Sequence, residues 1–300
     1  MEQLSESLVN HERASRVQKA VHGVGLNSPH KLLKRIREDE RLSQTRPRKR
    51  RATCPADTEA HSDMPKLTEG DLVIETNSLS PAEFQSRFLP IHSPLLVFVP
   101  EPKERPTAKT PADSLSMKLE TSAQLSKMEL DACFNLVEET SSEAYKNSTV
   151  RWRPKAKRRE MQDVDMRYIL VRRLSQPLDN NNSDQAPHDI LGFLSFMITM
   201  DDDYMYPVLY VYEVHLSEGL RGCGLGSHLM NVAEKIGQGV GVTKIMLTVF
   251  TSNTAAEKFY RRLGYSKDDI SPEPRVLRNK TVRPPDYMIM SKSLKDGDDA

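Results

Sequence analysis

The sequence predicts an α/β (α+β) domain over residues 122–295, with a central mixed, mainly antiparallel sheet flanked by helices. Two observations support this prediction. Strand-like and helical apolar segments alternate from residue 122 onward. Only 37% of the 300 residues are hydrophobic, and polar or proline-rich stretches lie at 26–70 and 100–116. We therefore do not expect the whole chain to pack into one core.

The residues before this domain are expected to form three parts. Residues 1–25 predict a helical segment, and residues 26–70 predict a basic, largely disordered arm with little to bury. Residues 71–121 predict an irregular, proline-rich segment that is partly packed on the domain. The other expectations outside the domain are a strand at 71–75, a short helix at 80–88 and a disordered tail at 296–300.

Within the domain, the first predicted element is a long helix. Ser126 and Glu129 have the spacing of a capping box, and apolar residues follow at helical intervals up to Tyr145. The elements expected after it are a short helix at 155–161, strands at 167–174, 190–200 and 208–216, a helix at 225–237, a strand at 244–250, a helix at 254–263 and a last strand at 286–294.

The net charge of +1 hides an uneven distribution. Residues 31–51 contain ten Lys or Arg and three acidic residues, so the rest of the chain is mildly acidic. The run Arg46–Arg51 is typical of a nuclear localisation patch or a phosphate-binding segment, and a solvated disordered run is the alternative. Because no aromatic residues interleave with these cations, we expect no obligatory nucleic-acid partner.

Several classes of protein are excluded by the sequence. The longest clean apolar run, Leu95–Val99, is far shorter than the roughly 18 residues that a membrane span needs. The first residues lack the apolar stretch of a signal peptide. The three cysteines are far apart and have no metal-binding spacing, which predicts a reducing compartment without a disulfide framework. We expect neither a membrane partner nor a metal.

The strongest local pattern is Arg221-Gly-Cys-Gly-Leu-Gly226, between a predicted strand and a predicted helix. Glycines let the backbone approach a ligand, and a helix start attracts anions such as a pyrophosphate. A P-loop would need a lysine after the last glycine, where this chain has Ser227. A dinucleotide fold would need G-x-G-x-x-G early in a βαβ unit. The pattern R-x-x-G-x-G fits every position, and a turn without a ligand remains the alternative.

A second motif runs from Asn253 to Tyr265, after the next predicted strand. Together the two motifs resemble the GNAT superfamily of acetyl-CoA-dependent N-acetyltransferases, through Arg221, Gly224 and Gly226 in the first and Asn253, Ala256, Phe259, Tyr260, Gly264 and Tyr265 in the second. The resemblance implies the GNAT fold, with a bulged strand and a glycine loop that binds CoA, and acetyl-CoA as co-substrate. It implies cofactor contacts from Val214, His215, Leu216, Arg221, Gly222, Cys223, Gly224, Leu225, Gly226, Asn253 and Tyr260. For Asn253, a helix N-cap is the alternative role.

Three further segments resemble the NatD type of N-terminal α-acetyltransferase, whose substrates are histone 4 and histone 2A beginning Ser-Gly-Arg-Gly. They are 210–216, 244–250 and the segment from Tyr145 to Met161. This resemblance implies acetylation of histone N-terminal tails, and we expect a monomer in the nucleus and cytoplasm. The alternatives are a lysine acetyltransferase of the GNAT type and a non-catalytic chromatin-binding protein. The chain departs from the NatD pattern at Val150 and Arg151, which stand in place of Trp and Gly, and at Gly222, which stands in place of a second basic residue.

The implied reaction needs a base, because an α-amine titrates near 7.7–8.0 and is partly protonated at neutral pH. Glu213 lies in an apolar, aromatic strand, where desolvation is expected to raise its pKa, and a structural carboxylate is the alternative. Tyr145 and Tyr212 are the other candidate catalytic residues, the former implied by the resemblance. Strict alternation would place Tyr210 and Tyr212 opposite Glu213, and the bulge expected in GNAT folds would remove this conflict.

The resemblance also implies a set of substrate contacts. An acidic pocket suits a tail that carries Arg, and Asp201 and Asp203 are the candidates, whereas Asp202 favours a solvated turn. Tyrosine rings suit a slot for a small peptide terminus, and ordinary strand propensity is the alternative reason for them. The candidate substrate-binding residues are therefore Trp152, Asp201, Asp203, Tyr210 and Tyr287.

Overall fold

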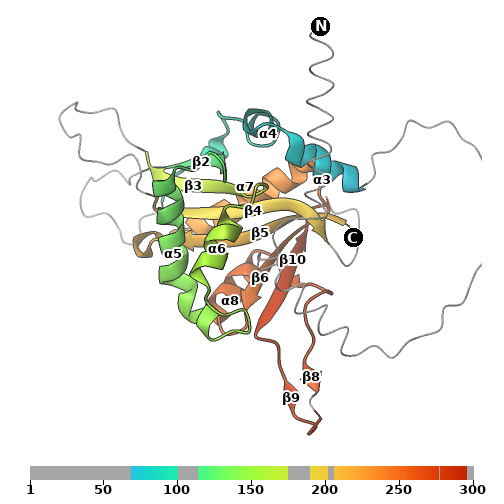
Figure 1. Cartoon of the computed structure of the whole chain (residues 1–300). Coiled ribbons are helices and arrows are strands. Elements are labelled where there is room, and N and C mark those ends of the chain that lie inside the picture. The colour runs from blue at the N-terminus through green and yellow to red at the C-terminus, as the bar shows by residue number, and fades with distance from the viewer. Residues whose placement is uncertain (1–68, 101–113, 175–189, 202–205, 277, 296–300) are drawn as a thin grey trace, which may run out of the picture. The chain divides into compact units, whose positions relative to one another are not determined.

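The computed structural model describes residues 69–100, 114–174, 190–201, 206–276 and 278–295 (Figure 1). Contacts divide the chain into two compact units, one of residues 56–152 and 161–300 and one of residues 1–55 and 153–160. In the smaller unit, the described residues are Arg153–Glu160, which comprise Arg153 and helix α6 (Pro154–Met161) up to Glu160. The expectations for 1–25, for most of 26–70 and for 296–300 lie outside the described residues.

The larger unit is built on an eight-stranded sheet in the order β1-β2-β3-β4-β5-β6-β10-β7. Every neighbouring pair is antiparallel except β5 and β6, which are parallel. The predicted mixed, mainly antiparallel sheet is therefore confirmed. Its strands are β1 (Val97–Phe98), β2 (Leu115–Thr121), β3 (Arg167–Arg173), β4 (Gly192–Asp201), β5 (Tyr206–Leu216), β6 (Lys244–Phe250), β7 (Ser266–Lys267) and β10 (Tyr287–Ser293).

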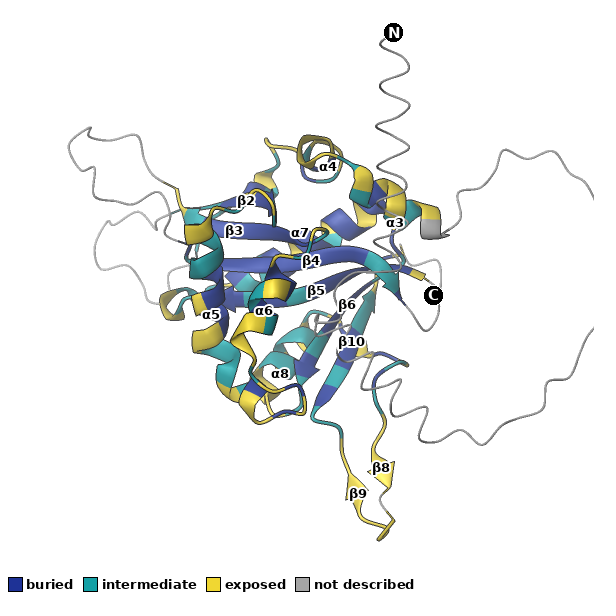
Figure 2. Cartoon of the chain, in the orientation of Figure 1, coloured by how far each residue is buried: buried dark blue, intermediate teal, exposed yellow. Residues whose placement is uncertain are grey.

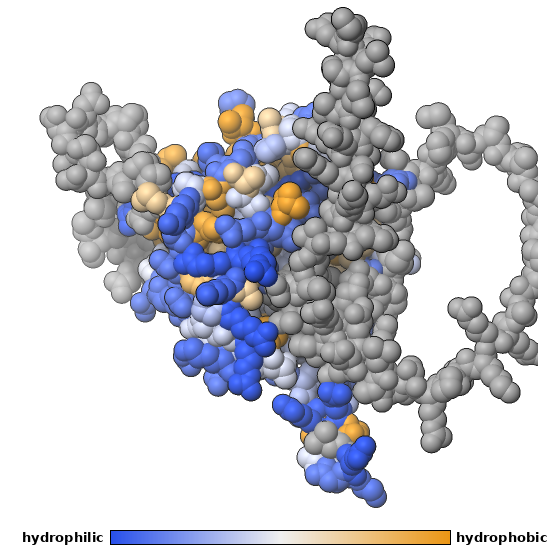
Figure 3. Space-filling view, viewed as in Figure 1, coloured by the Kyte–Doolittle hydropathy of each residue, from blue (hydrophilic) through white to orange (hydrophobic). Residues whose placement is uncertain are grey.

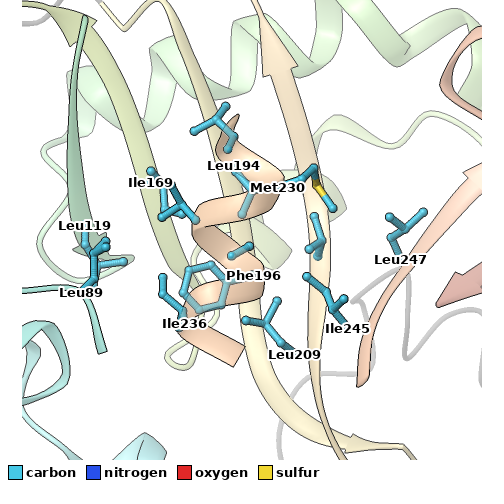
Figure 4. Packing of buried hydrophobic residues seen from close by; sticks show 14 of the residues in the cluster. Leu89, Leu119, Ile169, Leu194, Phe196, Leu209, Met230, Ile236, Ile245 and Leu247 are labelled. Carbon is cyan, nitrogen blue, oxygen red and sulfur yellow. The ribbon is translucent and has the colours of Figure 1, made fainter. Parts of the chain in front are cut away.

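One face of the sheet is covered by α7 (Leu225–Val240), whose apolar stripe predicts this packing from the sequence. Leu229, Val232 and Ile236 of this helix are fully buried in one core cluster with residues of β4 to β6. Figure 4 shows Ile236 beside Phe196 of β4. Helix α8 (Thr254–Arg262) adds Phe259 and Tyr260 to the same core. This arrangement fixes the start of α7, which carries the glycine motif, beside the end of β5.

The opposite face is covered by α5 (Lys127–Lys146) (Figure 1). Its predicted capping box is confirmed, since Ser126 Oγ accepts from the Glu129 amide at 3.2 Å and the Glu129 carboxylate accepts from the Ser126 amide at 2.8 Å. Phe134 and Val137 of the helix pack on Phe193 of β4 in a second apolar cluster. The sheet strands are largely buried between the two helical layers (Figure 2).

The prediction of a strand at 71–75 is wrong. These residues belong to helix α3 (Glu69–Ser78), which precedes the correctly predicted helix α4 (Pro81–Phe88). Tertiary contacts decide this outcome at the end of α3, where the Asn77 side chain donates to the Ile198 carbonyl at 2.9 Å and accepts from Arg167 at 2.9 Å. Burial lowers the pKa of Arg167, whose guanidinium also lies 4.2 Å from the centre of the Phe84 ring.

The expectation of an irregular segment before residue 122 is wrong for β2. This strand pairs with β3 along its whole length, from Leu115 opposite Arg173 to Thr121 opposite Arg167. Leu115, Met117 and Leu119 are buried at every second position, which is the period of a strand. The alternation is short and follows a run of prolines, and pairing with β3 makes it part of the sheet.

The elements predicted between 126 and 294 are present, with ends within three residues of their expected positions. A hairpin of β8 (Arg275–Val276) and β9 (Val282–Arg283) forms a separate two-stranded sheet. It projects as a mainly hydrophilic, exposed finger that includes Val276 and Val282 (Figures 2 and 3). Within the described ranges, no helix has the length and apolar character to cross a bilayer.

Candidate active site

The candidate site begins at an irregularity in β5. Along β4, Ser195 lies opposite Glu213, but the next residue, Phe196, lies opposite Val211. Tyr212 is therefore an extra residue in β5, which is the definition of a β-bulge. The bulge expected from the family resemblance is confirmed.

The bulge changes which side chains share a face. Val211 packs in the core beneath α7, whereas Glu213, only two residues later, turns to α5. Tyr212 packs with the cluster beneath α5, and its ring lies 5.3 Å from that of Tyr210. The conflict in the sequence is therefore removed, because Tyr210, Tyr212 and Glu213 all lie on the α5 face.

Glu213 is almost completely buried, and both of its oxygens have partners. The Tyr145 hydroxyl donates to Oε1 at 3.1 Å, and His215 Nε2 lies 2.5 Å from Oε2. On the far side of the imidazole, Nδ1 lies 2.5 Å from Thr140 Oγ1, which donates to the Leu136 carbonyl at 2.7 Å. A hydrogen-bonded chain therefore connects the carboxylate to α5 through His215.

Aromatic rings surround Tyr145 on this face. Its ring lies 5.5 Å from Trp152 and 4.9 Å from Phe250, measured between ring centres. Trp152 stacks on Phe134, and Tyr287 lies opposite Phe250 in the pairing of β10 with β6. The structure therefore brings the predicted residues Tyr145 and Trp152 into contact and places Tyr287 beside them.

Beyond the bulge, β5 and β6 separate. Their parallel register covers Val208–Val211 and Lys244–Leu247, although both strands continue further. Separation of parallel strands leaves a backbone edge to which an extended ligand can bind by hydrogen bonds. Val214, His215 and Leu216, which the sequence predicts as cofactor contacts, lie along this part of β5. The His215 side chain is directed to Glu213, so His215 can offer only its backbone to a ligand at this edge.

The predicted glycine loop leads into α7. Gly222 and Gly224 have φ angles of 74° and 89°, in the left-handed region that favours glycine. Gly224 is the N-cap and provides no side-chain cap, so the first-turn amides of α7 face outward at the positive end of the helix. A Cβ added to Gly226 would lie 3.3 Å from the Phe259 ring. Arg221 is exposed beside the loop. These residues fit the pyrophosphate of CoA.

Cys223 and Leu225 are the other predicted contacts in this loop. The Cys223 thiol donates to the Leu220 carbonyl at 3.1 Å, within the turn that follows the short 3-10 helix η2 (Glu218–Leu220). Leu225 is fully buried in the core beneath α7. Their side chains therefore shape the loop, and any cofactor contact would come from their backbone.

The second motif is placed at the start of α8. The Asn253 side chain accepts from the Ala256 amide at 3.1 Å, which confirms its role as N-cap, and its contact with CoA stays a prediction. Burial, and then the charge of Glu213, raise the pKa of Tyr260. The influence of Glu213 shows that Tyr260 lies near the candidate site.

Asp201 does not join this group. It is buried at the other end of β4, and its carboxylate lies 2.9 Å from Lys244 Nζ, which also contacts Asp268 at 3.1 Å. Six strand residues separate it from Ser195, the partner of Glu213, which corresponds to roughly 20 Å. The structure therefore gives Asp201 an internal ion pair, and its contact with substrate stays a prediction. Asp203 lies outside the described residues.

The loop before α6 carries a strained residue. Arg151 has a φ angle of 64°, a conformation that favours glycine, and it stands where the NatD pattern has glycine. Val150 beside it is buried. The loop is held to the start of β10, because the Thr149 amide donates to Asp286 and the Thr149 hydroxyl donates to the same carboxylate at 3.2 Å. The loop therefore accommodates Val150 in a buried position and Arg151 in a strained backbone conformation.

Sequence reasoning missed two residues of the site, Thr140 and Phe250. Thr140 lies on the buried side of α5 four residues after Leu136, where a threonine commonly returns its hydroxyl to the helix backbone. Phe250 ends an apolar strand and is indistinguishable from core residues in the sequence. The spacing of Glu213 and His215 on one strand is the pattern from which a shared face is predictable.

Comparison with known proteins finds similarity to one family over part of the chain. The model of the acetyltransferase (GNAT) family matches residues 143–265. Over 102 residues the chain is 34% identical to N-alpha-acetyltransferase 40 of Saccharomyces cerevisiae, a match that covers 28% of this chain and 36% of that protein. Over 82 residues it is 27% identical to the uncharacterized N-acetyltransferase YycN of Bacillus subtilis, covering 27% and 51%. The matched part thus spans between a third and about half of these curated relatives.

Two solved structures show limited similarity to the chain. The chain resembles Arabidopsis thaliana NAA60 in complex with a bisubstrate analogue, with 12% identity and a TM-score of 0.41 over 59% of this chain and 99% of that one. It also resembles the PaiA N-acetyltransferase of Thermoplasma acidophilum in complex with coenzyme A, with 15% identity and a TM-score of 0.39 over 59% and 99%.

The residues that match the family model include the main features of the candidate site. The bulge at Tyr212, the separation of β5 from β6 and the glycine loop before α7 all lie within the matched residues. The protein has the GNAT fold, and its residues 143–265 are similar to the acetyltransferase (GNAT) family.

Proposed function

We propose that this chain is an N-terminal α-acetyltransferase of the NatD type, which transfers acetyl from acetyl-CoA to the α-amine of histone 4 and histone 2A tails. The observation behind the reaction class is the buried Glu213 carboxylate, which the β5 bulge turns toward Tyr145 where β5 leaves β6. The substrate part rests on the similarity to N-alpha-acetyltransferase 40 and on the resemblance of strand 210–216 to NatD.

In this proposal Glu213 is the base. A protonated α-amine loses one proton to the carboxylate, and its nitrogen then attacks the acetyl carbonyl carbon while the carbon–sulfur bond breaks. The nitrogen loses a second proton, which the CoA thiolate takes up, and the first proton passes from Glu213 to solvent. Tyr145 orients the carboxylate through its 3.1 Å hydrogen bond. No covalent enzyme intermediate is needed, so Cys223 remains a turn residue.

The cofactor part of the proposal assigns the CoA pyrophosphate to the loop from Arg221 to Gly226. The left-handed glycines keep Cβ atoms out of the approach, the first turn of α7 offers amide donors, and Arg221 adds a positive charge. The backbone of β5 beyond the bulge would hold the extended arm that leads to the thioester. The aromatic group of Tyr145, Trp152 and Tyr287 would then receive the peptide terminus.

The test is acetyl transfer to defined peptides. The full chain is incubated with acetyl-CoA and a peptide that begins Ser-Gly-Arg-Gly and contains a lysine, either with a free or with a blocked N-terminus, and mass spectrometry locates the product. We expect acetyl on the free α-amine and none on the blocked peptide. Acetylation of lysine in the blocked peptide would overturn the α-amine assignment. Absence of acetyl-CoA binding in calorimetry would overturn the enzyme class.

A second peptide arm tests the charge of the substrate. Asp201, the expected partner of a substrate Arg, is paired with Lys244, and the hairpin that leads into Asp286 and Tyr287 carries exposed cations. We still expect Ser-Gly-Arg-Gly to be preferred over Ser-Gly-Glu-Gly, because of the NatD resemblance. The reverse preference would contradict the histone substrate and leave the reaction class intact. The cations of the hairpin are Arg275, Arg278, Lys280 and Arg283.

A further inference from the structure

The hydrogen bonds behind Glu213 determine where protons lie. The hydroxyl of Thr140 has one proton, and Thr140 donates it to the Leu136 carbonyl at 2.7 Å. While that bond is made, Thr140 Oγ1 can only accept in its 2.5 Å contact with His215 Nδ1, and the imidazole is then the donor. His215 consequently carries a proton on Nδ1, and its Nε2 is directed at Glu213.

The contact between His215 and Glu213 requires a second proton. Nε2 and Oε2 are 2.5 Å apart, and a bare ring nitrogen beside a bare carboxylate oxygen would place two lone pairs against each other. A proton placed between the two atoms removes this repulsion. The carboxylate and the imidazole therefore form one proton-binding site.

We propose that Glu213 and His215 are one proton-binding unit that receives the amine proton, and that His215 and Thr140 are positioning residues which act through Glu213. The inference rests on the proposed function and deepens it. One N–H bond of the substrate ammonium breaks, and the proton comes to lie between Oε2 and Nε2. It leaves to solvent after transfer. An imidazole that accepts from the protonated carboxyl stabilises the protonated form, and this makes Glu213 a stronger base.

The groups around Glu213 and His215 are compatible with a role in proton binding. Tyr145 faces it from α5 through its hydrogen bond to Oε1, and Tyr260 of α8 lies within the influence of the Glu213 charge. Because burial and that charge raise the pKa of Tyr260, this phenol stays protonated at the pH values where the pair would act. From β4, the residues opposite are Ser195 and Phe193, which do not ionise.

The kinetic test compares three variants of the full chain. His215→Gln keeps a hydrogen-bond donor to the carboxylate but cannot share a proton, so we expect kcat to fall by about tenfold or more. The acid limb of its kcat profile should move to lower pH, because Gln favours the ionised carboxylate. Thr140→Val should give a smaller loss, and Thr140→Ser should restore kcat. The KM for acetyl-CoA should stay within about twofold in all three, as expected for a loss confined to the chemical step.

The outcome is decided by the pH profile. If the acid limb of the kcat–pH profile of His215→Gln lies at the same pH as in the parent, the proposal is overturned. A purely structural role of His215 would lower kcat without moving this limb. Equal losses in Thr140→Ser and Thr140→Val would remove Thr140 from it. Circular dichroism of each variant identifies any variant that fails to fold. If His215→Gln fails to fold, the comparison of Thr140→Ser with Thr140→Val still tests the role of the hydroxyl.

A measurement without turnover separates this inference from the proposed function. Nitrogen NMR of the imidazole in the full chain should show a protonated Nδ1 and a partly protonated Nε2, and the Nε2 proton should be lost in Glu213→Gln. The opposite tautomer, with a bare Nδ1, would overturn the inference even if acetyl transfer is found. The expected tautomer in a chain that transfers no acetyl would contradict the proposed function alone.

Discussion

Two buried carboxylates in this molecule have opposite environments. Asp201 lies at the end of β4 beside the ammonium of Lys244, which also contacts Asp268. Glu213 lies in β5, bonded to the Tyr145 hydroxyl and to the His215 imidazole. The first carboxylate is neutralised by a permanent cation, whereas the partners of the second are groups that can share or exchange a proton.

The difference distinguishes a carboxylate that stabilises the fold from a carboxylate that can take part in proton transfer. Burial alone would raise the pKa of Asp268 and lower that of Lys244, but the hydrogen bonds and charges of the cluster lower the first and raise the second. Both groups therefore remain ionised across the neutral range, where they exchange no protons. Glu213 is hydrogen-bonded by Tyr145 and contacts the His215 imidazole, and groups that can share a proton are the environment expected of a base.

The largest expected effect tests the chemical side of the comparison. Glu213→Gln removes the proton acceptor while it keeps the size of the side chain, so kcat should fall by about 10²–10⁴-fold. Binding of acetyl-CoA, measured by calorimetry, should change little. Glu143→Gln is the matched control, because Glu143 is an exposed carboxylate of α5 paired with Lys146. Unchanged turnover of Glu213→Gln at every pH would contradict the role of Glu213.

The next effect tests the structural side. Lys244→Met leaves two carboxylates without their cation, and the free energy of unfolding should fall by about 3 kcal/mol, because Lys244 is mostly but not fully buried. Urea denaturation measures this loss. Turnover per folded molecule should stay near that of the parent. A stable Lys244→Met chain with poor turnover would reverse the distinction between the two clusters.

A smaller effect concerns Asp201 itself. Asp201→Asn keeps the shape of the side chain and removes its charge, so stability should fall by about 1–3 kcal/mol. The KM for the Arg-containing peptide should not change, because this carboxylate is engaged by Lys244 and not by substrate. A large rise in that KM, with the KM for acetyl-CoA unaltered, would restore Asp201 as a substrate contact.

The ion cluster also predicts how stability depends on pH. The pKa of Asp268 is lowered by folding, so its contribution is present above about pH 3.9, the unfolded value, and is lost as the pH falls through the folded value. The pKa of Lys244 is raised, so its contribution is present below about pH 10.4 and is lost as the pH rises further. In Asp268→Asn, denaturation between pH 2 and 5 should show a flatter acid limb. An unchanged limb would contradict the assignment to Asp268.

The smallest effect is a gain of stability near the aromatic wall. Arg151 has a left-handed backbone conformation, so Arg151→Gly should raise the free energy of unfolding by about 0.5–1 kcal/mol. A thermal melt detects this change, and Arg153→Gly, at a residue outside the left-handed region, is the control that should give no gain. Destabilisation by Arg151→Gly would show that the Arg151 side chain makes a contact that outweighs the strain.

Much of the fold was predictable because its elements have local patterns. The capping box of Ser126, the apolar stripe of α7 and the alternating strands each follow from the residues themselves. Helix α3 and strand β2 were not predictable in this way. The first depends on Asn77 and its partner Arg167, 90 residues away, and the second on pairing with β3.

The residues of the candidate site also fall into those that were predictable from local sequence and those that were not. The glycine loop and Asn253 were predictable because a positive φ angle and an N-cap are local requirements. The roles of Asp201 and Thr140 were not, because each depends on a partner from a distant part of the chain. A carboxylate in a sequence does not show whether a lysine or an imidazole will lie beside it.

The sequence by itself determined the order of the strands and helices predicted between residues 126 and 294, the start of α7 at a glycine loop and the chemical kinds of residue available to the site. The tertiary structure decided which of them meet. A single extra residue at Tyr212 turns Glu213 toward Tyr145, and the packing of α5 on β5 brings Thr140 to His215. The physical reason is that local patterns determine the conformation of a segment, whereas strand register and helix packing determine which side chains touch.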